Sequence, residues 1–346
     1  MEPYPKISVV IPIRNEALYI ARTIRYLLDQ DYPRDRLELL VVVGDSDDNT
    51  AEIVQGIAAQ DARVRYIYNP KTFSSSARNM GARVGTGEVI TYVDGHTYID
   101  NDQLLKNTAR LMQEKEVAVL SRPQFLETPD NTTFQKAVAL ARRSLIGHGL
   151  DSTIYTEKDM YVNPASSGAT YRREVFDRVG WFDEHFDASE DYEFNYRVAA
   201  AGYKAFTSLK LAVYYYPRKS LVALFKQMAR YGTGRMRLAR KHPTTLGLGT
   251  LMPVLFTLAL VLLPLAALFS IWSLYVWALA YGAYLVAVLA SALLISVRHG
   301  LVYLALVPPI YFIIHLGLGY GFLREGVKAL LSRAPSFRRD QDGSAS

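Results

Sequence analysis

The chain has 346 residues, half of them hydrophobic, with no cysteine and a formal net charge of +6. This length allows one large domain with an appendage, and the lack of cysteine excludes disulfides, thiolate catalysis and cysteine metal sites. No nucleic-acid-binding motif accompanies the modest positive charge, so we expect no nucleic-acid partner.

The first third of the chain alternates short apolar runs with segments of helical spacing. Runs rich in β-branched residues predict buried strands, and apolar residues three or four positions apart predict helices. Strands that alternate with helices predict an α/β domain with a parallel sheet covered on both faces. We expect strands at 7–13, 37–43, 64–68 and 88–93 and helices at 17–29, 50–59 and 74–84, with Ser74, Ser75 and Ser76 as candidate caps.

The middle of the chain is less regular. Residues 122–164 predict an insertion or a loop-rich region that contains one helix at 134–143. Regular structure resumes at 167–171, and a further helix at 190–201 ends at Gly202.

A basic segment follows at 218–241, with eight Lys or Arg residues, no acid and interleaved apolar side chains. The pattern is typical of one helix, or a pair of helices, in the lipid headgroup layer. Apolar side chains then rest on lipid and cations lie near anionic phosphates. An ordinary solvated helix is the alternative, and the position directly before an apolar run favours the membrane surface.

Residues 243–297 form a run of 55 residues without Asp, Glu, Lys or Arg. One bilayer crossing takes about 20 residues, so this run predicts two helices and a tight turn, and 301–323 predicts a third helix. Three crossings place the basic residues after 324 outside, against the positive-inside tendency. Either that rule is weak here or one run is re-entrant, and Pro308 and Pro309 make the third run the candidate.

These patterns divide the chain into four parts. We expect a catalytic domain at 1–217, a basic amphipathic interfacial segment at 218–242, transmembrane helices at 243–324 and a polar tail at 325–346, disordered from residue 334. The short polar N-terminus runs directly into a strand and predicts no signal peptide. We therefore expect a multi-pass protein of the plasma (inner) membrane with a cytoplasmic catalytic domain.

Polar clusters follow the first, second and fourth predicted strands, whose C-terminal ends share the edge where such sheets bind ligands. Asp94 and His96 come directly after the fourth strand and are separated only by Gly95. Two such side chains can reach one divalent cation, which neutralises a diphosphate and stabilises a departing nucleoside diphosphate. A plain pair of turn residues is the alternative, and the position at the sheet edge favours the metal site.

Two further groups of polar residues are candidates for catalysis or binding. Glu190 and Asp191 open a predicted helix, where acids also favour the positive end of the helix dipole. Asp191 could act as the general base that takes the proton from an acceptor hydroxyl. Gln227, Arg230 and Tyr231 are spaced to share one face of a helix, and that face could hold a phosphate or stack on a sugar.

Five motifs in order make residues 7–241 resemble the family-2 inverting glycosyltransferases. They are residues 10–16 (VIPIRNE), 43–50, 77–81 (ARNMG) with 87–88, Asp94-Gly95-His96 at the D-x-D position and Glu190-Asp191 at the E-D position. The resemblance implies a Rossmann-like nucleotide-diphospho-sugar transferase fold (GT-A) and an inverting transfer. Within the family, the D-x-H variant and residues 161–173 and 227–237 are closest to succinoglycan-type membrane-bound glucosyltransferases of exopolysaccharide synthesis.

The resemblance implies which residues carry the reaction. Asp191 would be the catalytic base, with Glu190 beside it. Asp94 and His96 would bind a divalent metal, Mn²⁺ or Mg²⁺, with His96 in place of the usual second carboxylate. Because imidazole is neutral and suits softer divalent metals, we expect Mn²⁺ to work at least as well as Mg²⁺.

The resemblance also implies which residues bind the substrates. Gln227, Arg230 and Tyr231 resemble the Q-x-x-R-W element of polysaccharide synthases and would contact the acceptor or the diphosphate. In the second-strand loop, the family's first Asp, which contacts the base, aligns with Val43. Asp45, two positions later, is the candidate to replace it, and the identity of the base stays open. The residues expected to bind the nucleotide sugar are Pro12, Arg14, Glu16, Asp45, Arg78, Asp94 and, under the donor sugar, Gly168.

Together these patterns predict a metal-dependent enzyme that moves a hexose from a nucleoside diphosphate sugar, UDP-hexose first, to a membrane-associated, polyprenyl-linked glycan among membrane lipids. One alternative is a processive polysaccharide synthase, whose channel needs many helices and therefore a homo-oligomer of this chain. Another is a polyprenyl-phosphate glycosyl synthase, whose acceptor is the lipid phosphate. A non-catalytic membrane scaffold is the alternative from another class, because a fold does not guarantee a function.

Overall fold

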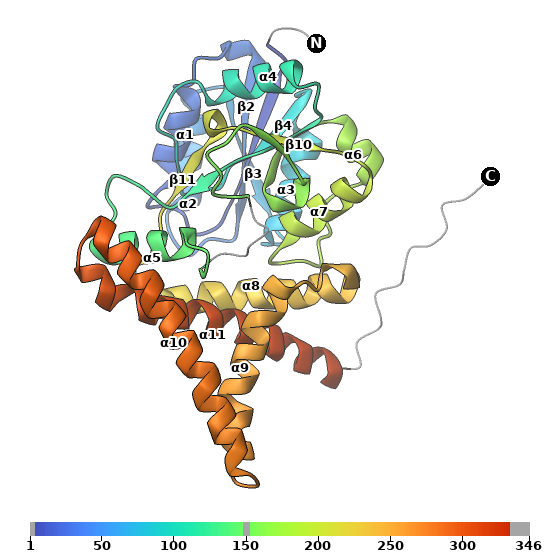
Figure 1. Cartoon of the computed structure of the whole chain (residues 1–346). Coiled ribbons are helices and arrows are strands. Elements are labelled where there is room, and N and C mark those ends of the chain that lie inside the picture. The colour runs from blue at the N-terminus through green and yellow to red at the C-terminus, as the bar shows by residue number, and fades with distance from the viewer. Residues whose placement is uncertain (1–3, 148–152, 333–346) are drawn as a thin grey trace, which may run out of the picture. The chain divides into compact units, whose positions relative to one another are not determined.

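The computed structural model describes residues 4–147 and 153–332, and the predicted disorder from residue 334 lies outside them. The chain forms two compact units, Met1–Lys219 and Ser220–Ser346. Figure 1 shows the first as an α/β unit built on a large sheet and the second as a helical unit. Each unit is described separately below.

Four parallel strands form the first half of the large sheet. They are β1 Ile7–Ile13, β2 Leu37–Gly44, β3 Val64–Asn69 and β4 Val89–Tyr92, within one residue of the predicted bounds at each end. They lie side by side in the order β3-β2-β1-β4. All of β2 is buried, as its continuous apolar run predicts for a strand covered on both faces.

The second half of the sheet is mixed, so the prediction of a parallel sheet is wrong there. Its strands are β9 Gly168–Arg172, β6 Val119–Ser121, β10 Ala205–Thr207 and β8 Met160–Val162, in that order after β4. β9 runs antiparallel to both β4 and β6. Between β6 and β9 the chain forms further elements, among them β8, and β9 then enters the sheet from the edge where β4 and β6 end.

A small three-stranded sheet and one helix belong to the region after β4. The small sheet has the order β5-β11-β7, from Thr97–Tyr98, Val213–Tyr215 and Gln124–Phe125. The helix predicted at 134–143 is confirmed as α5, Thr133–Arg143.

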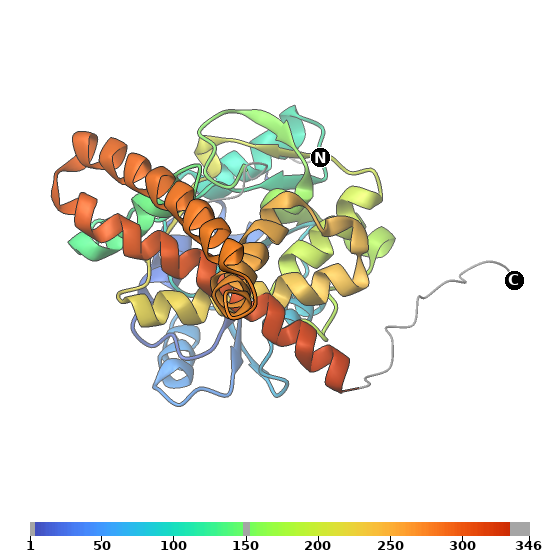
Figure 2. The ribbon, with the colours of Figure 1, turned by 60° about the horizontal axis from the view of Figure 1, so that its bottom comes forward.

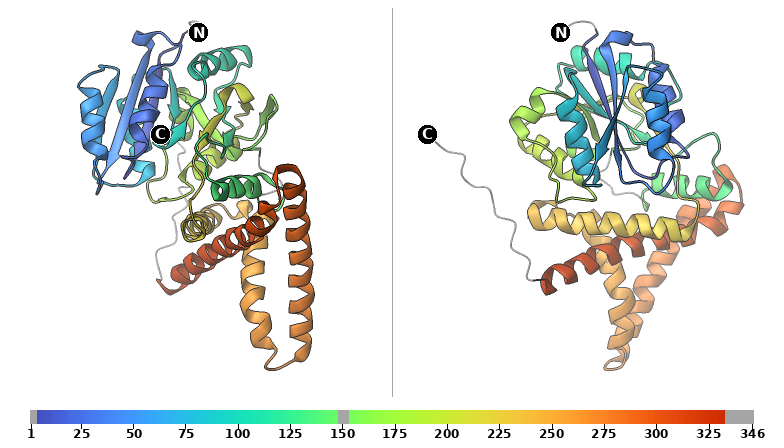
Figure 3. Two further views of the ribbon diagram at one scale, coloured as in Figure 1. Left: turned by 90° about the vertical axis from the view of Figure 1, so that its left-hand side faces the viewer. Right: turned by 180° about the vertical axis from the view of Figure 1, so that it is seen from behind.

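Helices cover both faces of the large sheet (Figure 3). Successive residues of a strand point to opposite faces, so apolar strands give the sheet a hydrophobic core on each side. In β1, Val9 and Ile11 belong to one hydrophobic core and Val10 to the other. The first core packs α1 (Ile20–Leu28), α2 (Thr50–Ala58) and α4 (Leu104–Glu114), and the second packs α3 (Ser74–Val84), α6 (Glu174–Val179) and α7 (Glu190–Ala200).

The serine caps predicted for α3 are wrong. The N-cap is Phe73, and it makes no side-chain cap hydrogen bond. The Ser75 hydroxyl instead donates to the Phe186 carbonyl at 2.9 Å, and the Ser76 hydroxyl donates to the Phe73 carbonyl at 2.8 Å. These hydroxyls donate to backbone carbonyls and do not accept a hydrogen bond from the N–H groups of the first turn of α3.

The second unit contains the basic helix and three apolar helices. The basic segment forms a single helix, α8 Leu221–Lys241, whose N-cap Ser220 accepts from the Ala223 N–H at 3.2 Å. α9 Leu248–Ala266, α10 Ile271–His299 and α11 Val302–Leu331 are each long and apolar enough to cross a membrane, as predicted. α9 and α10 form a hairpin, whose turn faces the viewer in Figure 2. α11 extends beyond residue 324, where we expected the tail to begin.

Candidate active site

The loops after β1 and β2 are fastened together at the carboxyl edge of the sheet. Asn15 has a positive φ of 56°, and its side-chain oxygen accepts from the Asp47 N–H at 2.8 Å. The Glu16 N–H donates to Thr50 Oγ1 at 2.8 Å. This extended loop delays the start of α1 to Ile20, three residues later than predicted. The polar residues predicted at this edge of the sheet therefore form a hydrogen-bonded pair of loops.

Two of the predicted nucleotide-binding residues meet in these loops. Arg14 Nε donates to the Asp45 carbonyl at 2.8 Å, and both residues are exposed. The Asp45 carboxylate accepts from the Tyr68 hydroxyl at 2.6 Å. Pro12 lies in β1 opposite Val42 of β2. Asp45 is thus held beside Arg14, although its position in the sequence differs from the family pattern.

Arg78 of α3 connects two motifs that lie far apart in the sequence. Its Nη2 lies 3.4 Å from Asp94 Oδ1, and its Nε lies 3.4 Å from Glu190 Oε1. The guanidinium also lies 5.0 Å from the centre of the Tyr92 ring. Burial lowers the pKa of Arg78, but the charges of Asp94, Glu190 and Asp191 outweigh it and the net pKa is raised. The side chain therefore stays charged and holds the carboxylates of both motifs together.

The predicted catalytic acids have different surroundings. Glu190 is 7% exposed, and its carboxylate accepts a hydrogen bond from Arg78 Nε. Asp191 is exposed, and its carboxylate accepts a 2.8 Å hydrogen bond from the Tyr192 N–H. Although the residue is accessible to solvent, the protein around its carboxyl removes part of the hydration and raises the pKa of Asp191. The negative charge of Glu190 raises this pKa further, and the charge of Arg78 opposes both effects. Asp191 is therefore the carboxylate that can meet a substrate.

His96 makes its strongest contact with a third predicted residue. Its Nδ1 lies 2.8 Å from Glu16 Oε1. Burial lowers the pKa of His96, but the hydrogen bond with Glu16 and the nearby charges of Glu16 and Asp94 raise it overall. Glu16, which the resemblance places among the residues that bind the nucleotide sugar, thus contacts the D-G-H segment.

The Asp94 and His96 side chains are compatible with a divalent cation. A metal-bound imidazole usually gives its other nitrogen to a carboxylate, and Glu16 provides that partner. Asp94 is 37% exposed at its side chain and can offer carboxylate oxygens. The described residues contain no cluster of three or more His, Asp or Glu side chains able to hold a metal. Further ligands would have to come from substrate phosphate and water, as is usual for Mg²⁺.

Gly168 is confined by its packing against α7. A Cβ at this position would collide with the Asn195 side chain. Asn195 donates to the Gly168 carbonyl at 2.9 Å and accepts from the Tyr171 hydroxyl at 2.7 Å. The small residue that the resemblance implies is therefore required by the position of α7.

Arg122 is a buried cation near the site that sequence reasoning missed. It is 3% exposed and donates to the Tyr92 carbonyl at 3.0 Å and to Thr91 Oγ1 at 2.5 Å. No ion pair with a carboxylate is found for it among the described residues, and burial lowers its pKa. The only sequence signal is an arginine directly after the apolar strand β6, because its partners lie about 30 residues away.

Gln227, Arg230 and Tyr231 lie on α8, in the second unit. Gln227 Nε2 donates to the Tyr231 hydroxyl at 3.4 Å, which confirms that these two residues share one helix face. Arg230 and Tyr231 are exposed. Their approach to the substrate of the α/β unit stays a prediction.

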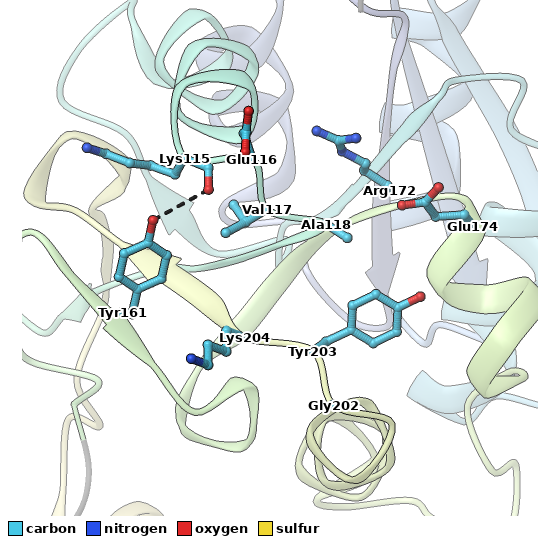
Figure 4. Close-up of a pocket in the computed structure, with 10 residues that line it drawn as sticks. All are labelled: Lys115, Glu116, Val117, Ala118, Tyr161, Arg172, Glu174, Gly202, Tyr203 and Lys204. Atoms are coloured by element: carbon cyan, nitrogen blue, oxygen red, sulfur yellow. Dashed lines mark hydrogen bonds between the residues drawn. The ribbon is translucent and has the colours of Figure 1, made fainter.

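A hollow of about 390 Å³ lies at the opposite edge of the sheet, where β6 and β10 begin and β9 ends (Figure 4). The Tyr161 hydroxyl there donates to the Lys115 carbonyl at 3.5 Å. No predicted site residue lines it. Because ligands of such sheets bind beyond the carboxyl ends of the strands, this hollow is not the candidate active site.

Comparison with known proteins gives consistent results. The model of "Glycosyl transferase family 2" matches residues 8–180. "Succinoglycan biosynthesis protein ExoA" of Rhizobium meliloti is 34% identical, over 71% of this chain and 74% of that protein. A Methanococcus voltae protein named "Dolichyl N-acetyl-alpha-D-glucosaminyl phosphate 3-beta-D-2,3-diacetamido-2,3-dideoxy-beta-D-glucuronosyltransferase" is 26% identical, over 93% and 97%.

A solved structure with the same fold is that of the mannosyltransferase PcManGT from Pyrobaculum calidifontis in complex with GDP-Man and Mn²⁺. It superposes with a TM-score of 0.57 at 21% identity, over 95% of this chain and 88% of that one. This similarity confirms the predicted GT-A fold of the α/β unit.

Proposed function

The chain belongs to glycosyl transferase family 2, and from this premise we propose that it transfers a hexose, with inversion, from a nucleoside diphosphate sugar to a polyprenyl-linked glycan at the membrane. UDP-hexose is the first donor to test, and the catalytic domain acts on the cytoplasmic side of the inner membrane. The observation that carries the proposal is Arg78, which joins Asp94 of the D-G-H segment to Glu190 of the E-D pair.

The donor side of the site consists of Asp94, His96, Glu16 and Arg78. A divalent cation, Mn²⁺ or Mg²⁺, supplies positive charge to the leaving diphosphate when Asp94 and His96 bind it. Glu16 fixes the orientation of the His96 ring through the 2.8 Å hydrogen bond. Arg78 limits the movement of the Asp94 carboxylate, so this metal-binding group is in position before the donor sugar nucleotide arrives.

The acceptor side is Asp191. Its carboxylate takes the proton of the acceptor hydroxyl, and that oxygen bonds to the anomeric carbon as the bond from this carbon to the diphosphate oxygen breaks. The raised pKa brings the proton affinity of Asp191 closer to the working pH, as suits a general base. Glu190 does not compete for the substrate, because it is buried against Arg78.

A membrane-borne acceptor is supported by the helical unit and by the relatives. Three helices of this chain are long and apolar enough to cross a membrane, and a basic helix precedes them. The name of the Methanococcus voltae relative describes transfer to a sugar carried on dolichyl phosphate, and that of the Rhizobium meliloti relative describes succinoglycan synthesis. We therefore propose a sugar hydroxyl on a lipid-linked glycan as the nucleophile.

The test is a donor screen with the purified full chain in detergent. Nucleoside diphosphate sugars are supplied with a lipid-linked oligosaccharide and either metal, and the released nucleoside diphosphate is measured. Asp191→Asn should lower turnover about 10²–10⁴-fold, while the control Asp177→Asn, on the exposed face of α6, should not. Full turnover of Asp191→Asn would refute the base assignment.

The same assay separates the two rival functions. Long products would instead indicate a processive synthase, and activity on polyprenyl phosphate alone would indicate a glycosyl phosphate synthase.

A further inference from the structure

The helical unit contains three apolar helices whose composition alone allows three membrane crossings. α11 differs from the other two in how far protein covers it. Its apolar window is 39% buried, against 17% for the windows of α9 and α10. A helix that spans lipid in a small hairpin exposes most of its surface, as α9 and α10 do, so the cover on α11 requires an explanation.

The cover comes in large part from α8, which packs lengthwise and parallel to α11. Phe225 of α8 contacts Tyr320 of α11, with ring centres 5.5 Å apart. Twelve residues later in α8, Arg237 Nε lies 2.8 Å from Glu325 Oε1 of α11. The two contacts follow one another in the same order along both helices, so α8 and α11 run in the same direction.

Glycines permit this close approach. A Cβ on Gly317 would lie 2.7 Å from the Met228 Cβ of α8, and a Cβ on Gly321 would collide with the Ala229 backbone. On the α8 side, a Cβ on Gly232 would collide with the Leu318 carbonyl. The apolar side of α8, which the sequence predicted to rest on lipid, is therefore covered by α11.

Both ends of α11 lie on the same side of the hairpin formed by α9 and α10. Its first residue follows the end of α10 after Gly300 and Leu301. Its last turns pair with α8 at Arg237, one turn before α8 ends and eleven residues before α9 begins. The turn between α9 and α10 is at the far end, and α11 slants across the other end of the hairpin without reaching that turn (Figure 3).

Contacts between α11 and the hairpin agree with this arrangement. Three α9 residues that approach α11 are Pro253 and Thr257, both beside Gly319, and Phe256, whose ring centre lies 5.9 Å from that of His315. All three lie in the first half of α9. The buried residues of α9 also lie in this half, whereas Val261, Leu262 and Leu265 are more than half exposed. A third crossing of the same depth would cover the second half too.

From this packing we infer that only α9 and α10 cross the bilayer and that α11 lies along its surface with α8, on the catalytic side. The partner of this helix pair is an anionic lipid surface. Leu304, Val327 and Leu331 of α11 are exposed and apolar and can enter the outer part of the acyl layer, while the cations of α8 lie near the phosphates.

The charges of the chain agree with two crossings. The far turn between α9 and α10, residues 267–270, has no charged residue. Arg298, Arg324 and Lys328 all fall on the catalytic side in this topology, together with the tail. The conflict with the positive-inside tendency, which three crossings create, disappears.

The experiment uses the natural absence of cysteine. Single cysteines are introduced into the full chain by Gln60→Cys in the catalytic domain, Ser270→Cys in the far turn and Ser332→Cys after α11, all at exposed positions. Intact cells and opened membranes are then treated with a membrane-impermeant maleimide. Retained nucleoside diphosphate release confirms that each variant is folded.

Two crossings predict that Ser332→Cys behaves like Gln60→Cys and opposite to Ser270→Cys, with labelling of only one of the two groups in intact cells. Labelling of Ser332→Cys together with Ser270→Cys, and not with Gln60→Cys, would establish a third crossing and overturn the inference. Equal labelling of Gln60→Cys and Ser270→Cys would remove the hairpin crossing and overturn it also. None of these outcomes depends on which sugar is transferred.

Discussion

Replacement of Arg78 by methionine should affect both stability and the pH dependence of catalysis. The substitution keeps much of the side-chain volume but removes the cation between Asp94, Glu190 and Asp191. Glu190 is 7% exposed, so it would be left as a buried carboxylate without its partner. Loss of one partner from a buried ion pair costs about 3–5 kcal/mol.

The structure indicates the lower end of that range. Both contacts of Arg78 are 3.4 Å, longer than a well-formed charged hydrogen bond, and the Asp94 side chain is 37% exposed. We therefore expect a loss of about 3 kcal/mol, which for a domain of this size lowers the Tm by about 6–12 °C.

The effect on catalysis follows from the sign of the Arg78 contribution. Arg78 opposes the rise in the pKa of Asp191, so its removal raises that pKa further. A base must be deprotonated to act, and activity is lost as the pH falls through its pKa. The acid limb of the pH–rate profile should therefore move to higher pH in Arg78→Met.

The assay combines thermal unfolding with nucleoside diphosphate release across a pH series. Arg110→Met is a matched control, because Arg110 is exposed and its pair with Glu114 contributes only about 0.3–0.5 kcal/mol. A Tm change no larger than that of Arg110→Met, together with an unmoved acid limb, would refute the role assigned to Arg78.

Two further substitutions test the supports of the site. Gly168→Ala brings a Cβ against the Asn195 side chain, so we expect the unfolding free energy to fall by about 1–3 kcal/mol and turnover to decrease. Both quantities are measured on the same preparation of the variant. His96→Asp restores a paired carboxylate site and removes the imidazole, so the ratio of the rate with Mg²⁺ to that with Mn²⁺ should increase. An unchanged ratio would contradict His96 as a ligand.

The fold was predictable where local patterns determine it. The β-branched runs of β1 and β2 are buried on both faces, and their bounds follow from the polar residues that end them. The antiparallel β9 was not predictable, because its direction depends on the path of the irregular segment before it and not on its own residues. Likewise, the apolar face of α8 gave no sign of whether lipid or another helix would cover it.

The members of the candidate site could be proposed from the sequence, but their contact partners could not. Asp94, His96 and Asp191 became candidates because each follows or begins a regular element at the carboxyl edge of the sheet. That Glu16 contacts His96, 80 residues away, and that Arg78 contacts Glu190, 112 residues away, depends on the packing of separate elements. Arg122 was missed for the same reason, since an arginine after a strand carries no information about its distant partners.

The contacts also separate two acids that the sequence presents as one motif. Adjacent residues at the start of a helix point in directions about 100° apart, so one can face the protein and the other the substrate. Glu190 faces Arg78 and is buried, and Asp191 faces outward and has its pKa raised in part by the charge of Glu190. In the proposed reaction Glu190 would therefore act through its neighbours: it contacts Arg78, which also contacts Asp94, and its charge increases the proton affinity of Asp191. The E-D motif in this way links Arg78 and Asp94 with Asp191, the residues to which the proposal assigns the donor and acceptor sides.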